Sequence, residues 1–413
     1  MNFKDLKLAN SILKAVELEG YKEPSPIQKE AIPHILNGKD ILASAQTGTG
    51  KTAAFALPLI NNLLNGDKHD KKIKVLVLTP TRELALQVRD NFRKYGINTN
   101  LKCSVIFGGV NQRSQVETLK RGVDILVATP GRLLDLMNQR RVDLRNVQSL
   151  VLDEADTMLD MGFIHDVKKI ISRIPVERQT LLFSATIPTE IKHLAKELLK
   201  DPITIKLNNE SLTVDKINQS VYFVDKINKA KLLLELLECN TLKSVLVFVR
   251  TKHGADKLSE VLEKNGVKNG VIHGNKSQNA RISALKNFKS GRHKVLVATD
   301  IAARGIDIIE LSHVINYEMP EKAETYVHRI GRTGRAGLDG NAISLCNVEE
   351  KKVLRQIEIS IKQTIAIIAE HSYPAQQAIT TNSHYNNRRN KGRNYSHKNY
   401  KNYYKRNVSK LAT

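Results

Sequence analysis

The chain has 413 residues, which predicts two or three domains, each large enough to bury its own core. Its 65 lysines and arginines against 42 aspartates and glutamates give a formal net charge of +23, which favours a polyanionic partner. Three widely spaced cysteines, Cys103, Cys239 and Cys346, argue against a disulfide framework or a zinc site. No signal-peptide core or membrane-spanning apolar run is evident, so we expect a cytoplasmic protein with no membrane partner.

The first strong signal is a glycine-rich turn between the apolar run 40–43 and a helical segment that starts near residue 53. Strand, glycine turn and helix in this order are typical of a phosphate-binding loop. Glycines permit backbone conformations that aim successive N–H groups at phosphate oxygens, and the helix N-terminus adds positive partial charge. Lys51 can reach the β- and γ-phosphates, and Thr52 is placed to bind Mg²⁺. The loop residues are Ala45, Gln46, Thr47, Gly48, Thr49, Gly50, Lys51 and Thr52, with Ala45 where glycine is usual.

A second signal lies about a hundred residues later, where an acidic run follows the apolar run 149–152. Asp153 is expected at the carboxyl end of a buried strand, where its carboxylate can hold Mg²⁺ through water. Glu154 is then positioned to orient an attacking water. The two signals together predict the hydrolysis of a nucleoside triphosphate with Mg²⁺.

Apolar runs alternate with helical patterns over the first 350 residues, which predicts an α/β fold with parallel sheets covered by helices on both faces. The expected strands include 75–78, 125–128, 150–152 and 181–183, then 245–249, 295–298, 314–317 and 342–346. Residues 125–129 resemble 295–299, and 77–78 resemble 247–248, at one offset of 170 residues. Two domains of one topology would explain this repeat, although buried strands also resemble one another by chance.

The second half supplies a concentration of cations in the segment 326–335. His328, Arg332 and Arg335 are its candidate catalytic residues. Phosphoryl transfer needs cations on the γ-phosphate, and arginines from a second domain would supply them only after the domains close. Hydrolysis would then report domain closure.

The C-terminal region divides into two parts. Apolar spacing predicts a helical extension over residues 349–370, and periodicity disappears beyond it. The tail, residues 371–413, is expected to be disordered and basic, with tyrosines interleaved with Lys, Arg and Asn. Nine basic residues lie in 381–413, which has no Asp or Glu, so the remainder carries +14 of the +23. Such a tail suits single-strand binding through phosphate contacts and base stacking, or serves only solubility.

These motifs, in this order, resemble those of the DEAD-box ATP-dependent RNA helicases, with the bacterial RhlE-type subgroup the most similar. The resemblance covers approximately residues 1–350 and implies two tandem RecA-like domains, at residues 1–207 and 219–348, joined by a linker at 208–218. It also implies ATP, since Phe3, Tyr21 and Gln28 match the family's adenine-reading motif and Asp307 matches a ribose contact. Ser184, Ala185 and Thr186 match the element that couples ATP to unwinding, and Arg332 and Arg335 match the arginine fingers.

The resemblance further implies RNA contacts on both sides of a cleft. In the first domain the matching residues are Pro80, Thr81, Arg82, Gly108, Gly109, Thr129, Pro130, Gly131 and Arg132. In the second they are Arg250, Thr251, Gly274, Gln278, Arg281, Thr299 and Asp300. Backbone contacts of this kind carry little sequence information, so we expect sequence-independent binding of single-stranded RNA or short duplexes.

The expected function is local, non-processive unwinding of short RNA duplexes, or remodelling of ribonucleoproteins, driven by ATP. An ATP-gated RNA clamp that rarely unwinds would use the same residues. A DNA helicase of the same superfamily is disfavoured by Gln28 and the acidic run, and a small-molecule kinase would not need the arginines of the second half. The resemblance makes ribosomal or RNA-decay machinery the partners to consider, and the sequence leaves that choice and the oligomeric state open.

Overall fold

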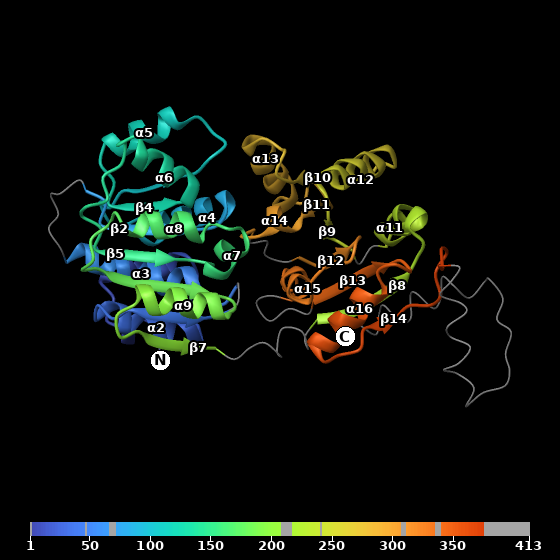
Figure 1. Cartoon of the computed structure of the whole chain (residues 1–413), viewed down its shortest axis with the longest axis horizontal. Coiled ribbons are helices and arrows are strands. Elements are labelled where there is room, and N and C mark those ends of the chain that lie inside the picture. The colour runs from blue at the N-terminus through green and yellow to red at the C-terminus, as the bar shows by residue number, and fades with distance from the viewer. Residues whose placement is uncertain are drawn as a thin grey trace.

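The structure, a computed structural model, describes residues 2–45, 48–65, 72–207, 217–239, 242–306, 311–334 and 340–375. It has two lobes that lie side by side, each built on one parallel sheet (Figure 1). In the described part of the chain, each sheet has seven strands. None of the described helices is both long and apolar enough to cross a bilayer.

The first lobe, domain 1, has the strand order β3-β4-β2-β5-β6-β1-β7. Its strands are β1 (Ile41–Ser44), β2 (Val75–Leu78), β3 (Cys103–Ile106), β4 (Ile125–Ala128), β5 (Ser149–Leu152), β6 (Gln179–Ser184) and β7 (Ile203–Lys206). Its helices are η1 (Phe3–Leu6), α1 (Asn10–Leu18), α2 (Pro26–Leu36), α3 (Lys51–Leu64), α4 (Arg82–Tyr95), α5 (Gln112–Lys120), α6 (Pro130–Asn138), α7 (Ala155–Asp160), α8 (Ile164–Ile171) and α9 (Thr189–Leu198).

The second lobe, domain 2, has the order β10-β11-β9-β12-β13-β8-β14. Its strands are β8 (Ile217–Phe223), β9 (Val245–Val249), β10 (Asn269–Ile272), β11 (Val295–Thr299), β12 (His313–Asn316), β13 (Gly340–Cys346) and β14 (Ala366–Ile367). Its helices are η2 (Lys226–Asn228), α11 (Lys229–Leu237), α12 (Lys252–Lys264), α13 (Gln278–Lys289), α14 (Asp300–Ala303), α15 (Ala323–Ile330) and α16 (Lys351–Ile361).

Side chains that alternate along the central strands explain why each sheet is covered on both faces. In β2, Val75 and Val77 belong to one apolar cluster of domain 1, while Leu76 and Leu78 belong to the other. The strand β9 divides in the same way between two clusters of domain 2. A strand that is apolar at every position must bury both faces, which requires helices above and below the sheet. The predicted fold class, two tandem RecA-like domains, is confirmed.

The segments that resemble each other at an offset of 170 residues are strands at equivalent positions in the two sheets. The strands β2 and β9 both occupy the third place in their sheets, and β4 and β11 both occupy the second. Their bounds are 75–78 and 245–249, and 125–128 and 295–299. The faint sequence similarity between these segments therefore reflects the shared topology of the two domains.

The C-terminal extension differs from the prediction of a helix over residues 349–370. The helix α16 ends at Ile361, and residues 366–367 form β14 at the edge of the second sheet. The chain turns at Lys362, whose φ is 55°, and Ile368 then donates a backbone hydrogen bond to Val221. Ile365 and Ile368 pack against the domain as extended chain, whereas Ala366 and Ile367 are exposed, so an apolar run of mixed burial had the spacing of a helix. The basic tail from residue 376 onward and most of the predicted linker lie outside the described residues.

Candidate functional site

The predicted motifs gather where the strands of the two sheets end. The phosphate loop follows β1, the acidic run follows β5, and the first predicted RNA contacts follow β2, β3 and β4. All of these strands are parallel, so their carboxyl ends share one edge of the sheet. Figure 1 shows β5 pointing towards domain 2. In open α/β sheets this edge is where ligands bind.

The phosphate loop is bent by Gly48 and Gly50, each with a φ of 90°. This left-handed conformation favours glycine. Its backbone is tied to the segment before α2, because Ser25 Oγ donates to the Thr49 carbonyl over 2.8 Å and Gln28 Nε2 donates to the Gly50 carbonyl over 3.1 Å. A Cβ at Gly50 would collide with the Gln28 amide. The loop is therefore held open, at the start of α3, by the segment that the sequence assigns to adenine.

Two buried groups in this loop region have no hydrogen-bond partner among the described residues. They are the ammonium nitrogen of Lys51 and Oδ1 of Asp153. Lys51 is 6% exposed and Asp153 is 2% exposed. Burial raises the pKa of Asp153 to about 7, against the opposing effect of Lys51. Buried charges without partners are costly, so this arrangement fits a ligand that brings phosphate oxygens and a divalent cation.

The residue after Asp153 has an unusual backbone. Glu154 has φ 54° and ψ 55° and stands at the N-terminus of α7. A non-glycine residue in this left-handed region is strained, and such strain is concentrated at functional sites. Glu154 is 5% exposed, so its carboxylate is held within the site.

The acidic run is joined to the predicted coupling element by hydrogen bonds. Asp156 Oδ2 accepts from the backbone N–H of Thr186 over 2.8 Å and from its hydroxyl over 3.0 Å. The backbone N–H of Asp156 donates to Ser184 Oγ over 3.2 Å, and Ser184 Oγ donates to the Thr186 carbonyl over 2.6 Å. The two segments are therefore joined by direct hydrogen bonds.

The aromatic residues assigned to adenine form a pair beside the loop. The rings of Phe3 and Tyr21 stack with centroids 6.3 Å apart and an interplanar angle of 23°. The hydroxyl groups of Tyr21 and Tyr95 are 2.9 Å apart, which fixes the Tyr21 ring on α4. Both ends of the Gln28 amide already form hydrogen bonds. Nε2 donates to the Gly50 carbonyl, and Oε1 accepts from the backbone N–H of Ser25 over 2.9 Å.

The predicted RNA contacts of domain 1 include a cationic cluster at the start of two helices. Thr81 and Thr129 are the N-terminal caps of α4 and α6, so backbone N–H groups face the cleft. Gly109, with a φ of 76°, allows the Arg82 guanidinium to lie against the backbone. Burial and the neighbouring Arg281 lower the pKa of Arg82. Helix N-termini with guanidinium groups beside them suit phosphate binding.

Those of domain 2 lie at equivalent positions. Thr251 caps α12, and its hydroxyl accepts from the Gly254 N–H over 3.0 Å. The loop with Gly274 is fixed by His273, whose ring lies 2.9 Å from Asp256 and accepts from the Asn275 N–H over 3.2 Å. The structure thus brings the loops of the two domains to facing edges.

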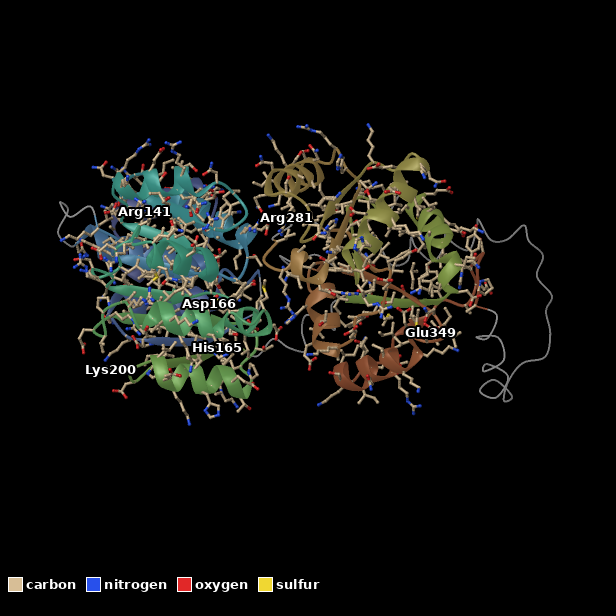
Figure 2. All side chains as sticks on the ribbon, turned by 45° about the horizontal axis from the view of Figure 1, so that its top comes forward. Arg141, His165, Asp166, Lys200, Arg281 and Glu349 are labelled. Atoms are coloured by element: carbon tan, nitrogen blue, oxygen red, sulfur yellow. The ribbon has the colours of Figure 1, made fainter. Side chains whose placement is uncertain are left out.

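Direct hydrogen bonds cross between the domains. Glu83, on α4, accepts from Gln278 Nε2 over 3.0 Å and from Arg281 over 2.8 Å. Arg304 donates to Asp160 over 2.9 Å. Figure 2 shows Arg281 at the edge of domain 2 that faces domain 1. Arg281 Nε is buried and has no hydrogen-bond partner among the described residues.

The arginine segment of domain 2 lies opposite the acidic run. Partial burial of His328 lowers its pKa, as do the neighbouring Arg332 and Arg304, while the carboxylates of Asp156 and Glu154 oppose that shift. Arg332 donates to the Ile306 carbonyl over 3.0 Å. A small pocket includes both His328 and Arg332. The predicted finger residue Arg332 is therefore on the side of domain 2 that faces Glu154.

One predicted RNA contact, Asp300, is bound within domain 2 by an arginine that was not predicted. Asp300, assigned to RNA, is clasped by Arg329 through Nε at 2.5 Å and a terminal nitrogen at 2.8 Å. Arg329 is 1% exposed and also donates to Asn316 and the Glu318 carbonyl. This arginine positions the loop after β11, where Thr299 also lies.

The sequence reasoning did not single out Glu83, Asp156, Asp160 or Arg329, which carry these contacts. Two signals were available: Glu83 stands beside Arg82 in the same motif, and Asp156 is the fourth residue of the acidic run. The predicted residues Gln46, Thr47, Asp307 and Arg335 lie outside the described residues.

Comparison with known proteins agrees with this arrangement. Residues 25–194 match the DEAD/DEAH box helicase family, and residues 228–337 match the helicase conserved C-terminal domain. The chain is 44% identical over 380 residues to the DEAD-box ATP-dependent RNA helicase RhpA of Helicobacter pylori, covering 92% of this chain and 76% of that protein. It is 42% identical to CshA of Bacillus subtilis, with 92% and 77% covered.

The chain belongs to the DEAD-box family of ATP-dependent RNA helicases. Solved DEAD-box structures share its fold. Saccharomyces cerevisiae Dbp5 bound to RNA and ADP BeF3 superposes with a TM-score of 0.80 at 31% identity, covering 92% of this chain and 98% of that one. Mss116p bound to single-stranded RNA and AMP-PNP superposes with a TM-score of 0.81 at 29% identity, covering 90% and 79%. This DEAD-box protein is thus an ATP-dependent RNA helicase.

Proposed function

We propose that this DEAD-box protein hydrolyses ATP in domain 1 only when RNA holds domain 2 against it, and that closure locally separates a short RNA duplex. The observation that carries the proposal is the pair of buried, unpartnered groups, Lys51 Nζ and Asp153 Oδ1. They lie on the edge of domain 1 that faces the arginine segment. The described residues alone leave their hydrogen-bonding capacity unused, and Mg²⁺-ATP would satisfy it.

Lys51 binds the β- and γ-phosphates, with the N–H groups of the loop around Gly48 and Gly50. Asp153 and Thr52 would hold Mg²⁺, which when bound neutralises charge on the phosphates. In the described residues no three His, Cys, Asp or Glu side chains converge to hold a metal ion, as expected for a cation held largely by the nucleotide. Glu154 orients the water that attacks the γ-phosphorus, and the bond to the bridging oxygen breaks to release ADP and phosphate.

Domain 2 completes the site. Arg332, together with Arg335, stabilises the negative charge that develops on the γ-phosphate, and His328 helps to hold these cations opposite Glu154. The hydrogen bonds of Glu83 to Gln278 and Arg281 support this placement, because they join the motifs that grip RNA on the two sides. ATP and RNA therefore favour the same closed state, and each must increase the affinity of the other.

The RNA is held by its backbone and not by its sequence. Helix N-termini capped by Thr81, Thr129 and Thr251, with Arg82 and Arg132 beside them, offer N–H groups and cations to phosphates. Closure bends the bound strand, and the opposing strand of a short duplex separates. The bonds from Asp156 to Thr186 transmit the state of the nucleotide site to this step.

Three finer assignments remain predictions. The basic, tyrosine-rich composition of residues 381–413 supports placement in the bacterial RhlE-type subgroup. Cys103, Cys239 and Cys346 form no disulfide in the described part of the chain, and the cytoplasmic location remains a prediction from the sequence. Ribosomal and RNA-decay machinery are the partners to test first, by recovering RNAs crosslinked to the protein in cells.

Two variants of the nucleotide site test the proposal. Lys51→Ala should remove much of ATP binding and turnover, by about 10²-fold or more, since it deletes a buried cation from the phosphate site. The matched control is Lys39→Ala, which changes an exposed lysine just before β1, the strand that leads into the phosphate loop. Glu154→Gln should bind ATP and RNA but hydrolyse slowly. Full RNA-stimulated turnover by Lys51→Ala would contradict the phosphate site, and wild-type turnover by Glu154→Gln would remove its assigned role.

A strand-displacement assay on a short duplex, measured beside ATPase, tests the output. We expect displacement that requires ATP and a duplex short enough to melt after local opening. RNA-stimulated hydrolysis without displacement would instead identify an ATP-gated RNA clamp.

A further inference from the structure

A second concave surface lies on domain 1, away from the nucleotide and RNA site. It is a groove of about 680 Å³, which we call the basic groove. Six cationic side chains line it: Lys72, Lys120, Arg140, Arg141, Arg145 and Arg173. They come from the segment before β2, the end of α5, the loop from α6 to β5, and the chain after α8. Because four separate segments contribute, the cluster is created by the fold and not by one charged helix.

The basic groove carries little compensating charge. Its lining has one carboxylate, Asp143, which is already bound by Arg145 over 2.8 Å and 3.0 Å. Lys120, Arg140 and Arg141 are exposed, and the structure shows no ion pair for them among the residues it describes. Like charges that converge without counter-charges repel one another, so the arrangement favours a polyanion.

The position of the groove separates it from the helicase site. The residues Ile73, Val123 and Asn146 precede β2, β4 and β5, so the groove lies at the amino ends of these strands. The predicted RNA contacts lie at the carboxyl ends of the same strands, across a sheet that is four residues, or roughly 13 Å, long at β4. Figure 2 shows Arg141 on the side of domain 1 away from domain 2, whereas Arg281 lies at the facing edge.

The lining also indicates how a ligand is recognised. Its apolar members, such as Ile73, Val123 and Leu144, are buried parts of the domain 1 core, which leaves the cations to form the accessible rim. None of the lining residues is aromatic. Unpaired bases would therefore have no ring on which to stack, while phosphates on the outside of a double helix need only cations.

We propose that the basic groove binds the phosphate backbone of double-stranded RNA, as a second RNA site on the back of domain 1. RNA is favoured over an acidic protein segment because the chain belongs to a family of RNA helicases and because the groove offers charge without a pocket for a specific side chain. The site holds the paired part of a substrate on the domain that also grips the strand being opened. It contacts phosphates, so it is indifferent to sequence.

The test uses the full chain with two charges reversed, Lys120→Glu/Arg141→Glu. The matched control is Lys192→Glu/Lys196→Glu, which reverses two exposed lysines on α9 of the same domain. The probe is a labelled blunt RNA duplex of about 16 base pairs, the length that double-stranded RNA-binding modules span. Its affinity is measured by fluorescence anisotropy between about 50 and 200 mM salt. Excess unlabelled single-stranded RNA and a non-hydrolysable ATP analogue occupy the helicase site.

We expect the groove variant to bind the duplex at least about tenfold more weakly than the control variant. The slope of log affinity against log salt should fall by about 2, one for each phosphate contact removed. ATPase stimulated by short single-stranded RNA should stay at the wild-type level in both variants. This ATPase readout separates the two proposals. If single-stranded RNA did not stimulate the ATPase of the wild-type protein, the helicase site would be contradicted and the basic groove would not.

Three results would overturn the inference. Equal weakening in the groove and control variants would mean that only overall charge matters. Unchanged duplex affinity in the groove variant would exclude the groove as an RNA site. Unchanged RNA binding, combined with loss of binding to an acidic peptide such as polyglutamate, would reassign the groove to an acidic protein partner.

Discussion

The two domains have the same strand order but place opposite chemistry at the edges that face each other. At the edge of domain 1, Lys51 and Asp153 are buried with polar atoms that have no partner among the described residues. At the edge of domain 2, Arg329 is bound to Asp300, and Arg332 is bound to the Ile306 carbonyl. Domain 1 therefore holds an incomplete site that a ligand can fill, whereas domain 2 presents cations that are already positioned. The comparison shows that the same fold occurs in both domains and that the loops after its strands carry different functional groups.

The largest effect should come from removing the contribution of domain 2. Arg332→Ala should lower RNA-stimulated ATP turnover by about 10³-fold or more, because an arginine finger acts on charge that develops in the transition state. ATP affinity should change little, since the nucleotide is bound by domain 1. Steady-state turnover and nucleotide binding measure the two separately, with the exposed Arg355 on α16, changed to Ala, as the control. Equal loss of ATP affinity and turnover would mean that domain 2 binds the ground state.

A smaller effect is expected at the hydrogen bonds between Asp156 and Thr186, which we propose couple the nucleotide site of domain 1 to RNA unwinding. Asp156→Asn places an amide beside donors from Thr186, and a buried mismatch of this kind costs about 1 to 3 kcal/mol. Strand displacement should slow by roughly tenfold, while RNA-stimulated ATPase falls much less. Assays of both activities on one preparation check this. A proportional loss of both would place Asp156 in hydrolysis and not in coupling.

The smallest effect concerns how domain 2 responds to acid. Burial lowers the pKa of His313 to about 4 from an ordinary value near 6.5. As the pH falls, His313 is therefore protonated in the unfolded chain before it is protonated in the folded one. The contribution of neutral His313 to the free energy of unfolding is fully present above pH 6.5 and is lost as the pH falls towards 4. His313→Gln should flatten this loss by about 1 to 3 kcal/mol in denaturant unfolding at pH 4 to 5. His165→Gln, which changes an exposed histidine in domain 1, is the matched control.

The central strands were predictable because they are rich in apolar residues, and those at 75–78 and 245–249 are apolar at every position. The strands β3, β7, β8, β10 and β14 were not identified, since their sequences are mixed in character. The strand β10 contains Asn269 and Gly270, and β7 alternates between buried and exposed positions. Propensity is weak for such segments, and their pairing with a neighbouring strand decides their conformation.

In the candidate site, chemistry carried by a local motif was predictable. The structure brings Lys51, Asp153 and Glu154 to one edge, as their place after apolar runs indicated. Contacts between distant segments were not predictable, because a single sequence does not show that Glu83 meets Arg281 almost two hundred residues later. The cations of the basic groove escaped notice for the same reason, since they are scattered from Lys72 to Arg173 and converge only in the fold.

The most direct test of the account is the ATP turnover of domain 1 alone, residues 1–207, compared with the full chain at saturating single-stranded RNA. ATP binding by the isolated domain serves as the check that it is folded. We predict that it binds ATP but turns it over at least about 10³-fold more slowly, because the arginines of domain 2 are absent. Turnover equal to that of the full chain would contradict the claim that the site is completed only when the two domains meet.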